Sequence, residues 1–181
     1  MGIAVCLAWA VGAYSRLNRM REQVVQARAS VLKYCKLYPA LLSQWQTDFG
    51  DMNAQPANTA AISGQGAGFL PWKNLSDAIL ALQTPLAAWE VPSATCAQAN
   101  ALSAALDEVQ SCVEALASVP EDLAGAVWPV EERGRWMALV ADIRLRRSRY
   151  NVYANEMNEA AAQMPAALIA RVAGISIWGL L

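Results

Sequence analysis

A seven-residue repeat of apolar side chains toward the carboxyl end is the feature that most restricts how this chain can fold. Five large apolar residues follow one another at intervals of seven, and a neighbouring register is apolar at four of its five positions. A helix with apolar positions about every 3.5 residues buries that seam against other helices. The repeat therefore predicts a long helix that begins near Val130 and packs along the rest of the protein. The first register is Trp136, Ile143, Tyr150, Met157 and Met164, and the second is Val140, Arg147, Ala154, Ala161 and Leu168.

Apolar residues at steps of three and four predict three further helices upstream. One apolar stripe begins at Leu17 and reaches Pro39, where the helix should kink or restart because proline cannot continue its hydrogen bonding. Two more helices are expected: one has apolar positions from Leu75 to Trp89, and the other, capped by Ser93 or Thr95, has apolar positions from Ala99 to Leu116. No stretch alternates apolar and polar residues for long enough to form a strand. The expected fold class is therefore all-α, an antiparallel four-helix bundle with long first and last helices.

A stretch rich in glycine, alanine, proline and asparagine separates the first predicted helix from the others. Residues 50–73 have no helical periodicity, so we expect a loop there. Three closely spaced glycines within it lack the preceding strand and the Gly-Lys-Ser/Thr ending that a phosphate-binding loop needs. The expected organisation is an apolar segment over residues 1–14, followed by one bundle domain over residues 15–181.

Composition excludes several classes of function. The chain has no histidine, so it can form neither a Ser-His-Asp triad nor a zinc site that relies on imidazole. Its cysteines, at positions 6, 35, 96 and 112, do not have the spacing of metal ligands. A net charge of −1 and a charged fraction of 16% argue against general nucleic-acid binding. We therefore expect no catalytic, cofactor-binding or metal-binding residues, no cofactor and no nucleic-acid partner.

Charge is unevenly distributed along the chain. Residues 1–36 carry a net charge of +5 and residues 37–130 a net charge of −8. Four arginines between residues 144 and 149 are interpreted as a solvated helix face that pairs with the acidic middle of the chain. Because the heptad pattern places Arg147 toward the core, its guanidinium needs a carboxylate partner. The candidate partners on the third predicted helix are Asp107, Glu108 and Glu114.

The apolar start is interpreted as a membrane anchor. Residues 3–14 contain no charged side chain, include tryptophan and tyrosine residues typical of membrane interfaces, and are followed by three arginines. As a helix this run spans roughly 18 Å, less than the roughly 30 Å hydrocarbon core, so it would be the inner part of a spanning helix. A signal-peptide region and a buried helix end remain alternatives. The anchor residues are Ile3, Leu7, Trp9, Tyr14, Arg16, Arg19 and Arg21.

The arginines behind the apolar start also predict an orientation. Basic residues that follow a membrane segment favour the cytoplasmic side, which places the N-terminus outside and the bundle in the cytoplasm. The expected partners are membrane lipid, contacted through the N-terminal segment, and a protein that the sequence does not identify. The alternative is a soluble helical protein-binding module that assembles through its apolar first helix.

Two blocks of sequence carry a family resemblance. Residues 14–21 read Tyr-Ser-Arg-Leu-Asn-Arg-Met-Arg and residues 38–42 read Tyr-Pro-Ala-Leu-Leu. Tyr150-Asn151 is followed by Met-Pro-Ala-Ala-Leu-Ile-Ala at 164–170. These blocks resemble the Tyr-Asn-x-Leu, Ile-Pro-Asn-Leu-Val, Tyr-Asn and Phe-Pro-x-x-Leu-Ile-Ala motifs of the LemA family of bacterial membrane-anchored proteins. The matched positions, expected to be structural, include Leu17, Pro39, Tyr150, Asn151, Pro165, Leu168, Ile169 and Ala170.

The LemA resemblance implies an N-terminal transmembrane helix at the bacterial inner membrane and a cytoplasmic helical bundle. It implies neither an enzymatic activity nor a cofactor. Met157-Asn158 stands where the family has a second Tyr-Asn, and residues 43–130 match only in helical character. The expected function is therefore that of a non-enzymatic, membrane-anchored interaction or scaffolding module whose biochemical role the sequence does not identify.

Overall fold

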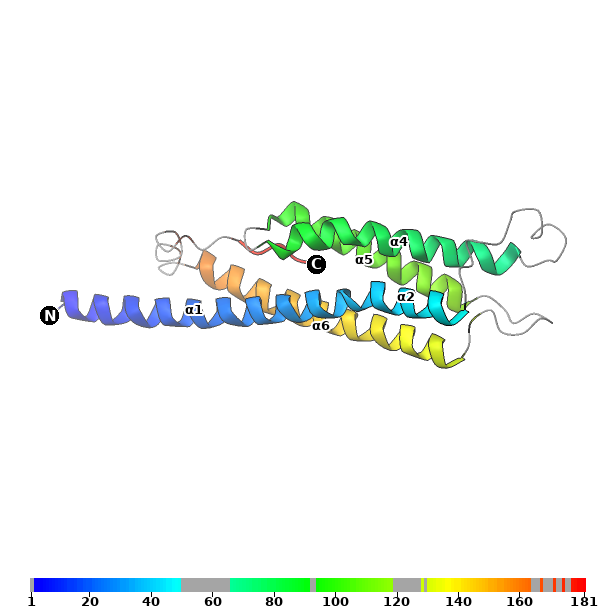
Figure 1. Cartoon of the computed structure of the whole chain (residues 1–181). Helices are drawn as coiled ribbons and strands as arrows, with labels where there is room; N and C mark the ends of the chain where they lie inside the picture. Colours follow the sequence, from blue (N-terminus) through cyan, green and yellow to red (C-terminus); the bar gives the residue numbers. More distant parts are fainter. Residues whose placement is uncertain are drawn as a thin grey trace.

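The structure is a computed structural model that describes residues 2–49, 66–91, 94–118, 128, 130–163, 167, 171, 174 and 177–181. Regular secondary structure in these residues is entirely helical, which confirms the predicted all-α class. Figure 1 shows an elongated bundle in which the helices lie lengthwise beside one another. The helices are α1 (Gly2–Cys35), α2 (Leu37–Phe49), α4 (Gly66–Glu90), α5 (Cys96–Ala117) and α6 (Val130–Ala162).

Helices α1 and α2 follow one another along one edge of the bundle (Figure 1). The break between them is at Lys36, and Pro39 lies in the first turn of α2, so the predicted restart at this proline is confirmed. Proline is tolerated in a first turn because its missing N–H has no helical acceptor there. The Lys36 amide still donates to the Leu32 carbonyl at 3.1 Å, so the chain continues in nearly the same direction.

The predicted apolar seams form the core. α1 packs mainly on α6, and α4 packs mainly on α5. The described members of the first heptad register on α6 are all buried, as the repeat predicted. The stripe is buried at Leu17, Val24 and Val31 on α1 and continues at the next heptad position, Tyr38, on α2. The last members of the two α6 registers, Met164 and Leu168, lie outside the described residues.

A cluster of tryptophans joins three helices at one end of the bundle. Trp45 of α2 stacks on Trp72 of α4 with ring centroids 3.8 Å apart. Trp128 and Trp136 meet Trp72 edge-on at 5.4 and 6.5 Å. All four side chains are buried, so their surface is removed from water and their edge-to-face contacts add to the stability of the core.

The loop predicted over residues 50–73 is wrong in its last part. α4 begins at Gly66, so residues 66–73 are helical, and residues 50–65 lie outside the described residues. Composition favours a loop here because glycine and Pro71 disfavour helix. The stacking of Trp72 on Trp45 gives this part of α4 a packing partner that is distant in sequence, and such tertiary contacts override local propensity.

Candidate functional site

The C-terminal segment Ile177–Leu181 is held against α6 by two asparagines. The Asn158 carboxamide accepts a hydrogen bond from the Trp178 amide and donates one to the Trp178 carbonyl, both at 2.9 Å. Asn151 does the same for Leu181, accepting at 2.8 Å and donating at 2.5 Å. The segment has no helical structure, so these side chains satisfy main-chain groups that would otherwise need water.

The middle of this segment is fixed by a buried tyrosine and a glycine. The Tyr150 hydroxyl donates to the Gly179 carbonyl at 2.7 Å. A Cβ atom at Gly179 would lie 2.7 Å from Ala99 Cβ and 2.8 Å from Cys96 Cα, both in the first turn of α5. Only glycine therefore lets the chain approach α5 this closely. The site thus combines side chains of α6 with the backbone of α5.

The first turn of α5 is itself well ordered by its cap. The Thr95 hydroxyl accepts from the Gln98 amide at 3.3 Å, and the Gln98 side chain accepts from the Thr95 amide at 2.7 Å. This reciprocal capping box satisfies two amides that have no helical partner. It fixes where α5 begins, and so it fixes the surface against which Gly179 packs.

A buried arginine of α1 lies on the other side of the segment. Arg28 is 7% exposed, and its Nη2 donates to the Trp89 carbonyl and, at 2.6 Å, to the Val91 carbonyl. Its guanidinium also lies 4.8 Å from the Trp89 ring centroid and 6.0 Å from that of Trp178. Burial lowers the pKa of Arg28, and the neighbouring Tyr150 raises it. The cation is held by carbonyls at the end of α4 and by aromatic faces.

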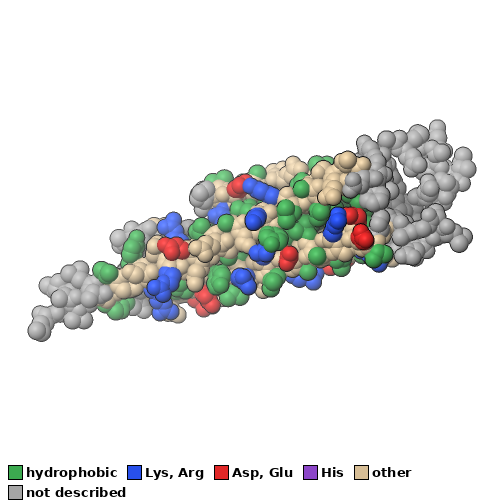
Figure 2. Space-filling model, turned by 60° about the horizontal axis from the view of Figure 1, so that its bottom comes forward, with side chains coloured by type: hydrophobic (Ala, Val, Ile, Leu, Met, Phe, Trp, Pro, Cys, Tyr) green, Lys and Arg blue, Asp and Glu red, His purple; other side chains and the backbone are tan. Residues whose placement is uncertain are grey.

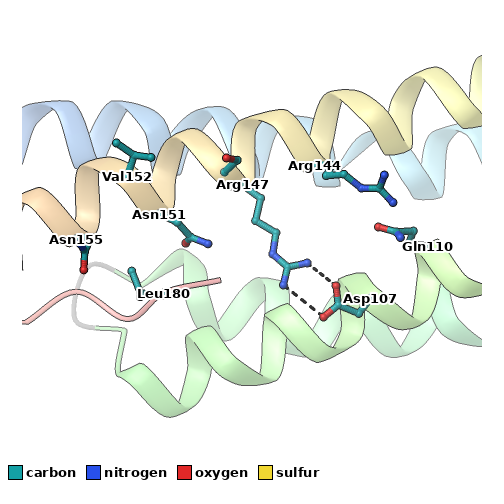
Figure 3. Close-up of a pocket in the computed structure, with 9 residues that line it drawn as sticks. Asp107, Gln110, Arg144, Arg147, Asn151, Val152, Asn155 and Leu180 are labelled. Atoms are coloured by element: carbon teal, nitrogen blue, oxygen red, sulfur yellow. Dashed lines mark hydrogen bonds and ion pairs between the residues drawn. The ribbon is translucent and has the colours of Figure 1, made fainter.

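An open hollow of about 570 Å³ lies beside the end of the segment, between α5 and α6. Figure 3 shows the Arg147 guanidinium crossing from α6 to Asp107 on α5, with Leu180 and Asn151 on the other side of the hollow. Arg147 binds both Asp107 oxygens, at 2.5 and 3.3 Å, and donates to Ser103 Oγ. The expectation that a carboxylate of the third predicted helix pairs with Arg147 is confirmed, with Asp107 as that carboxylate.

The predicted anchor residues lie between Ile3 and Arg21 of α1, whose N-terminal end extends past the other helices in Figure 1. Trp9 is 47% and Tyr14 51% exposed, and the three arginines that follow are also exposed. Figure 2 shows apolar and basic side chains beside the tapered end of the molecule. Ile3 and Leu7 lie in the same helix, and their side chains are outside the described set.

The residues of the family resemblance fall into three groups. Tyr150 and Asn151 act together on the C-terminal segment, while Leu17 lies in the core and Pro39 in the first turn of α2. The third group lies outside the described residues, so its expected structural role remains a prediction. It consists of Pro165, Leu168, Ile169 and Ala170.

Two residues of the site were not predicted as site residues. Arg28 carries a charge on a helix face that is otherwise an apolar stripe, and that mismatch is the signal that could have found it. Asn158 lies seven residues after Asn151 and therefore on the same face of α6. Nothing in the sequence identifies main-chain atoms of residues 177–181 as the partners of the two carboxamides.

Several buried groups have shifted pKa values. Burial raises the pKa of the Cys35 thiol to about 12, and the charge of Arg147 acts in the opposite direction. Burial likewise raises the pKa of Tyr150 to about 12, and it raises the pKa of Tyr38 and of the Cys112 thiol. A thiol with a raised pKa is a poor nucleophile, and both Cys35 and Cys112 are buried in the core.

The chain was compared with protein families, curated proteins and solved structures. No family model, no curated protein and no solved structure matches it. In the part of the chain that the structure describes, no helix combines the length and the apolar character needed to cross a membrane. The same part contains no cluster of three cysteine or carboxylate side chains that could hold a metal ion.

Proposed function

We propose that this protein is a non-enzymatic interaction or scaffolding module that is anchored to a membrane by the N-terminal end of α1. The observation that carries the proposal is the exposure of Trp9, Val11 and Tyr14 on a helix that extends beyond the bundle. Among the described side chains of α1, Leu17 is the first that is buried. Large apolar side chains exposed on different sides of one projecting helix are typical of a segment that another molecule covers.

Lipid is the partner that the chemistry of this end favours. Tryptophan and tyrosine rings are enriched at the level of lipid headgroups, and arginines directly behind them contact headgroup phosphates. The three arginines at positions 16, 19 and 21 are exposed and follow Tyr14 immediately. We therefore place the bundle on the cytoplasmic side of a bacterial inner membrane, with the N-terminus directed outward.

The proposal includes an antiparallel arrangement of the four helical rods formed by α1–α2, α4, α5 and α6. Its support is the order of contacts along the chain. Arg146 donates to Ser30 at 2.7 Å, and Trp136 stacks on Tyr38 at a centroid distance of 6.2 Å. Residues later in α1–α2 therefore contact residues earlier in α6, which is the order of contacts between antiparallel helices. The contacts between α5 and α6 reverse in the same way. Antiparallel neighbours need only short connections.

We assign the protein to the LemA type on the motif residues quoted above, of which Tyr150 and Asn151 have a definite structural task. A non-enzymatic role is supported by the chemistry of the shifted groups. The cysteines and tyrosines with shifted pKa values are shifted by burial in the direction that keeps them protonated and unreactive. A catalytic nucleophile needs the opposite shift.

The test is membrane fractionation with an alkaline carbonate wash in a bacterial host. The full chain is compared with the triple variant Trp9→Ser, Val11→Ser, Tyr14→Ser, whose changed side chains are all exposed. The matched control is Leu80→Ser, Leu145→Ser, Val152→Ser, which removes exposed apolar side chains elsewhere on the bundle. We expect the wild type and the control in the membrane pellet and the triple variant in the supernatant.

A wild-type chain that stays in the supernatant would contradict the anchor. Sedimentation equilibrium would then test the alternative, a soluble module that assembles through its apolar first helix. In that case the wild type and the control should associate with rising concentration, and the triple variant should remain a monomer.

A further inference from the structure

We propose that α6 and the first turn of α5 form a binding groove for an extended peptide segment of a partner protein. In this structure the groove holds the chain's own residues Ile177–Leu181 as its ligand. The inference does not depend on membrane anchoring, because none of the groove residues lies in the projecting end of α1. The supporting observation is that Asn151 and Asn158 form hydrogen bonds with main-chain atoms of the segment.

The two asparagines bind the ligand through its backbone alone. Each carboxamide uses its oxygen to accept from an amide and its nitrogen to donate to the carbonyl of the same residue. Tyr150 adds a third main-chain contact at Gly179. Every peptide carries these amides and carbonyls, so any extended segment whose side chains fit can make the same five hydrogen bonds.

The spacing of the asparagines matches that of an extended chain. Asn151 and Asn158 are two helical turns apart on one face, a rise of roughly 10.5 Å at about 1.5 Å per residue. Their ligands, Leu181 and Trp178, are three residues apart, which in an extended chain spans roughly 10 Å at about 3.3 Å per residue. The distance between the two carboxamides on the helix therefore matches the distance between the main-chain groups that they bind in an antiparallel extended peptide.

The side chains of the segment define which ligands fit. Gly179 has no room for a Cβ atom, Leu181 is buried, and Trp178 lies over the Arg28 guanidinium. Ile177 and Leu180 are 73% and 45% exposed, so the groove places little restriction on them. The preferred ligand is an extended peptide with the pattern aromatic-Gly-x-Leu.

An open hollow of about 570 Å³ adjoins the segment at Leu180 and Asn151 and continues to Arg144 and Arg147 (Figure 3). A ligand with further residues after its leucine can extend into this hollow, where both arginines already pair with carboxylates of α5.

The experiment empties the groove in the full chain without altering its walls. In the variant Gly179→Val the added side chain would collide with Ala99 and Cys96, so the chain's own segment should leave while the groove residues stay in place. The probe is a fluorescein-labelled peptide, Ile-Ser-Ile-Trp-Gly-Leu-Leu, whose binding is followed by fluorescence anisotropy. We expect Gly179→Val to bind it at least about tenfold more tightly than the wild type, because no internal segment competes.

Further variants test whether binding uses the groove. Adding Asn151→Leu or Asn158→Leu to Gly179→Val should weaken peptide binding by about tenfold, since each removes two hydrogen bonds and keeps the side-chain volume. Adding Asn100→Leu, which changes an exposed residue of α5, should leave binding unchanged. A probe with valine in place of its glycine should not bind.

If Gly179→Val loses its far-ultraviolet helical signal, a second measurement on the wild-type chain tests peptide binding. In the ¹⁵N-labelled wild-type chain, excess unlabelled peptide should move the Leu181 amide resonance to the position of an unbonded amide. Equal binding of the glycine and valine probes, or an unmoved Leu181 resonance at saturating peptide, would overturn the proposal. A wild-type dimer that disappears in Gly179→Val would also overturn it, because the occupant would then be a second copy of this chain.

Discussion

At the scale of single residues, Arg28 links parts of the chain that are far apart in sequence. One nitrogen of its guanidinium bonds two carbonyls at the carboxyl end of α4, where a helix has acceptors without helical donors. The positive charge also faces the negative end of the α4 dipole, which is a favourable arrangement. Its other neighbours are the rings of Trp89 and Trp178. A charge that would be costly in an apolar core is thus compensated by carbonyls and aromatic faces.

Replacing this arginine should destabilise the fold. We expect Arg28→Met to lower the free energy of unfolding by about 2 kcal/mol, since the variant keeps the aliphatic volume but leaves two carbonyls without their donor. The free energy of unfolding of Arg28→Lys should lie between that of the wild type and that of Arg28→Met, because a lysine keeps the charge but cannot reproduce the planar fork of donors. The measurement is urea denaturation followed by circular dichroism. Arg19→Met, at an exposed position of the same helix, is the control, and an equal loss in both variants would refute the role of Arg28.

At the scale of elements, the long carboxyl-terminal helix was the most predictable part of the fold. Its heptad registers are largely apolar over more than four repeats, and such a repeat is typical of a helix that buries one seam against other helices. The start of α4 was not predictable in the same way. The first turns of α4 are helical where Trp72 makes a long-range contact with Trp45. The local composition of residues 66–73 does not indicate a packing partner that is distant in sequence.

The candidate site was predictable only in fragments. Tyr150 was assigned to the heptad core and Asn151 to a family motif, and both assignments concern α6 alone. Their actual partners are carbonyls and amides of residues 179–181. Every residue has those groups, so no residue type marks them in a sequence. The pairing depends on how the chain returns after α6, which periodicity does not describe.

The α6 seam predicts a strong effect of a buried charge. We expect Met157→Asp to destabilise the protein by about 3–5 kcal/mol, because Met157 is fully buried in the seam and an unpaired carboxylate there loses its hydration. The measurement is a thermal melt monitored by circular dichroism. Val152→Asp, at an exposed position on the same helix, should change stability little. If the two variants melt alike, the assignment of the seam is wrong.

At the scale of the whole molecule, the described buried groups with raised pKa values make stability depend on alkaline pH. The pKa of Cys35 rises from 9.0 to about 12 and that of Tyr150 from 10.0 to about 12. Below about pH 8 both groups are protonated in the folded and the unfolded chain, so their contribution to stability is fully present. Above pH 9 the unfolded chain releases these protons first, and stability falls progressively until about pH 12.

This linkage gives a quantitative expectation. Between pH 8 and pH 11 the free energy of unfolding should decrease, and the decrease should be smaller by roughly 1–3 kcal/mol in Cys35→Ala. Val25→Ala, which changes an exposed side chain of the same helix, should show the full decrease. Urea titrations at each pH measure both quantities. A decrease of the same size in wild type and Cys35→Ala would mean that the thiol does not contribute to the alkaline sensitivity.

The unbroken course of α1 has a mechanical consequence. From exposed Trp9 to buried Arg28 the helix runs about 29 Å at about 1.5 Å per residue, without a break in its hydrogen bonding. Such a rod transmits torque and tension along its length, because it has no hinge at which they could dissipate. Arg28, whose guanidinium touches both the end of α4 and the Trp178 ring, is therefore joined to the projecting end of the molecule by one continuous helix.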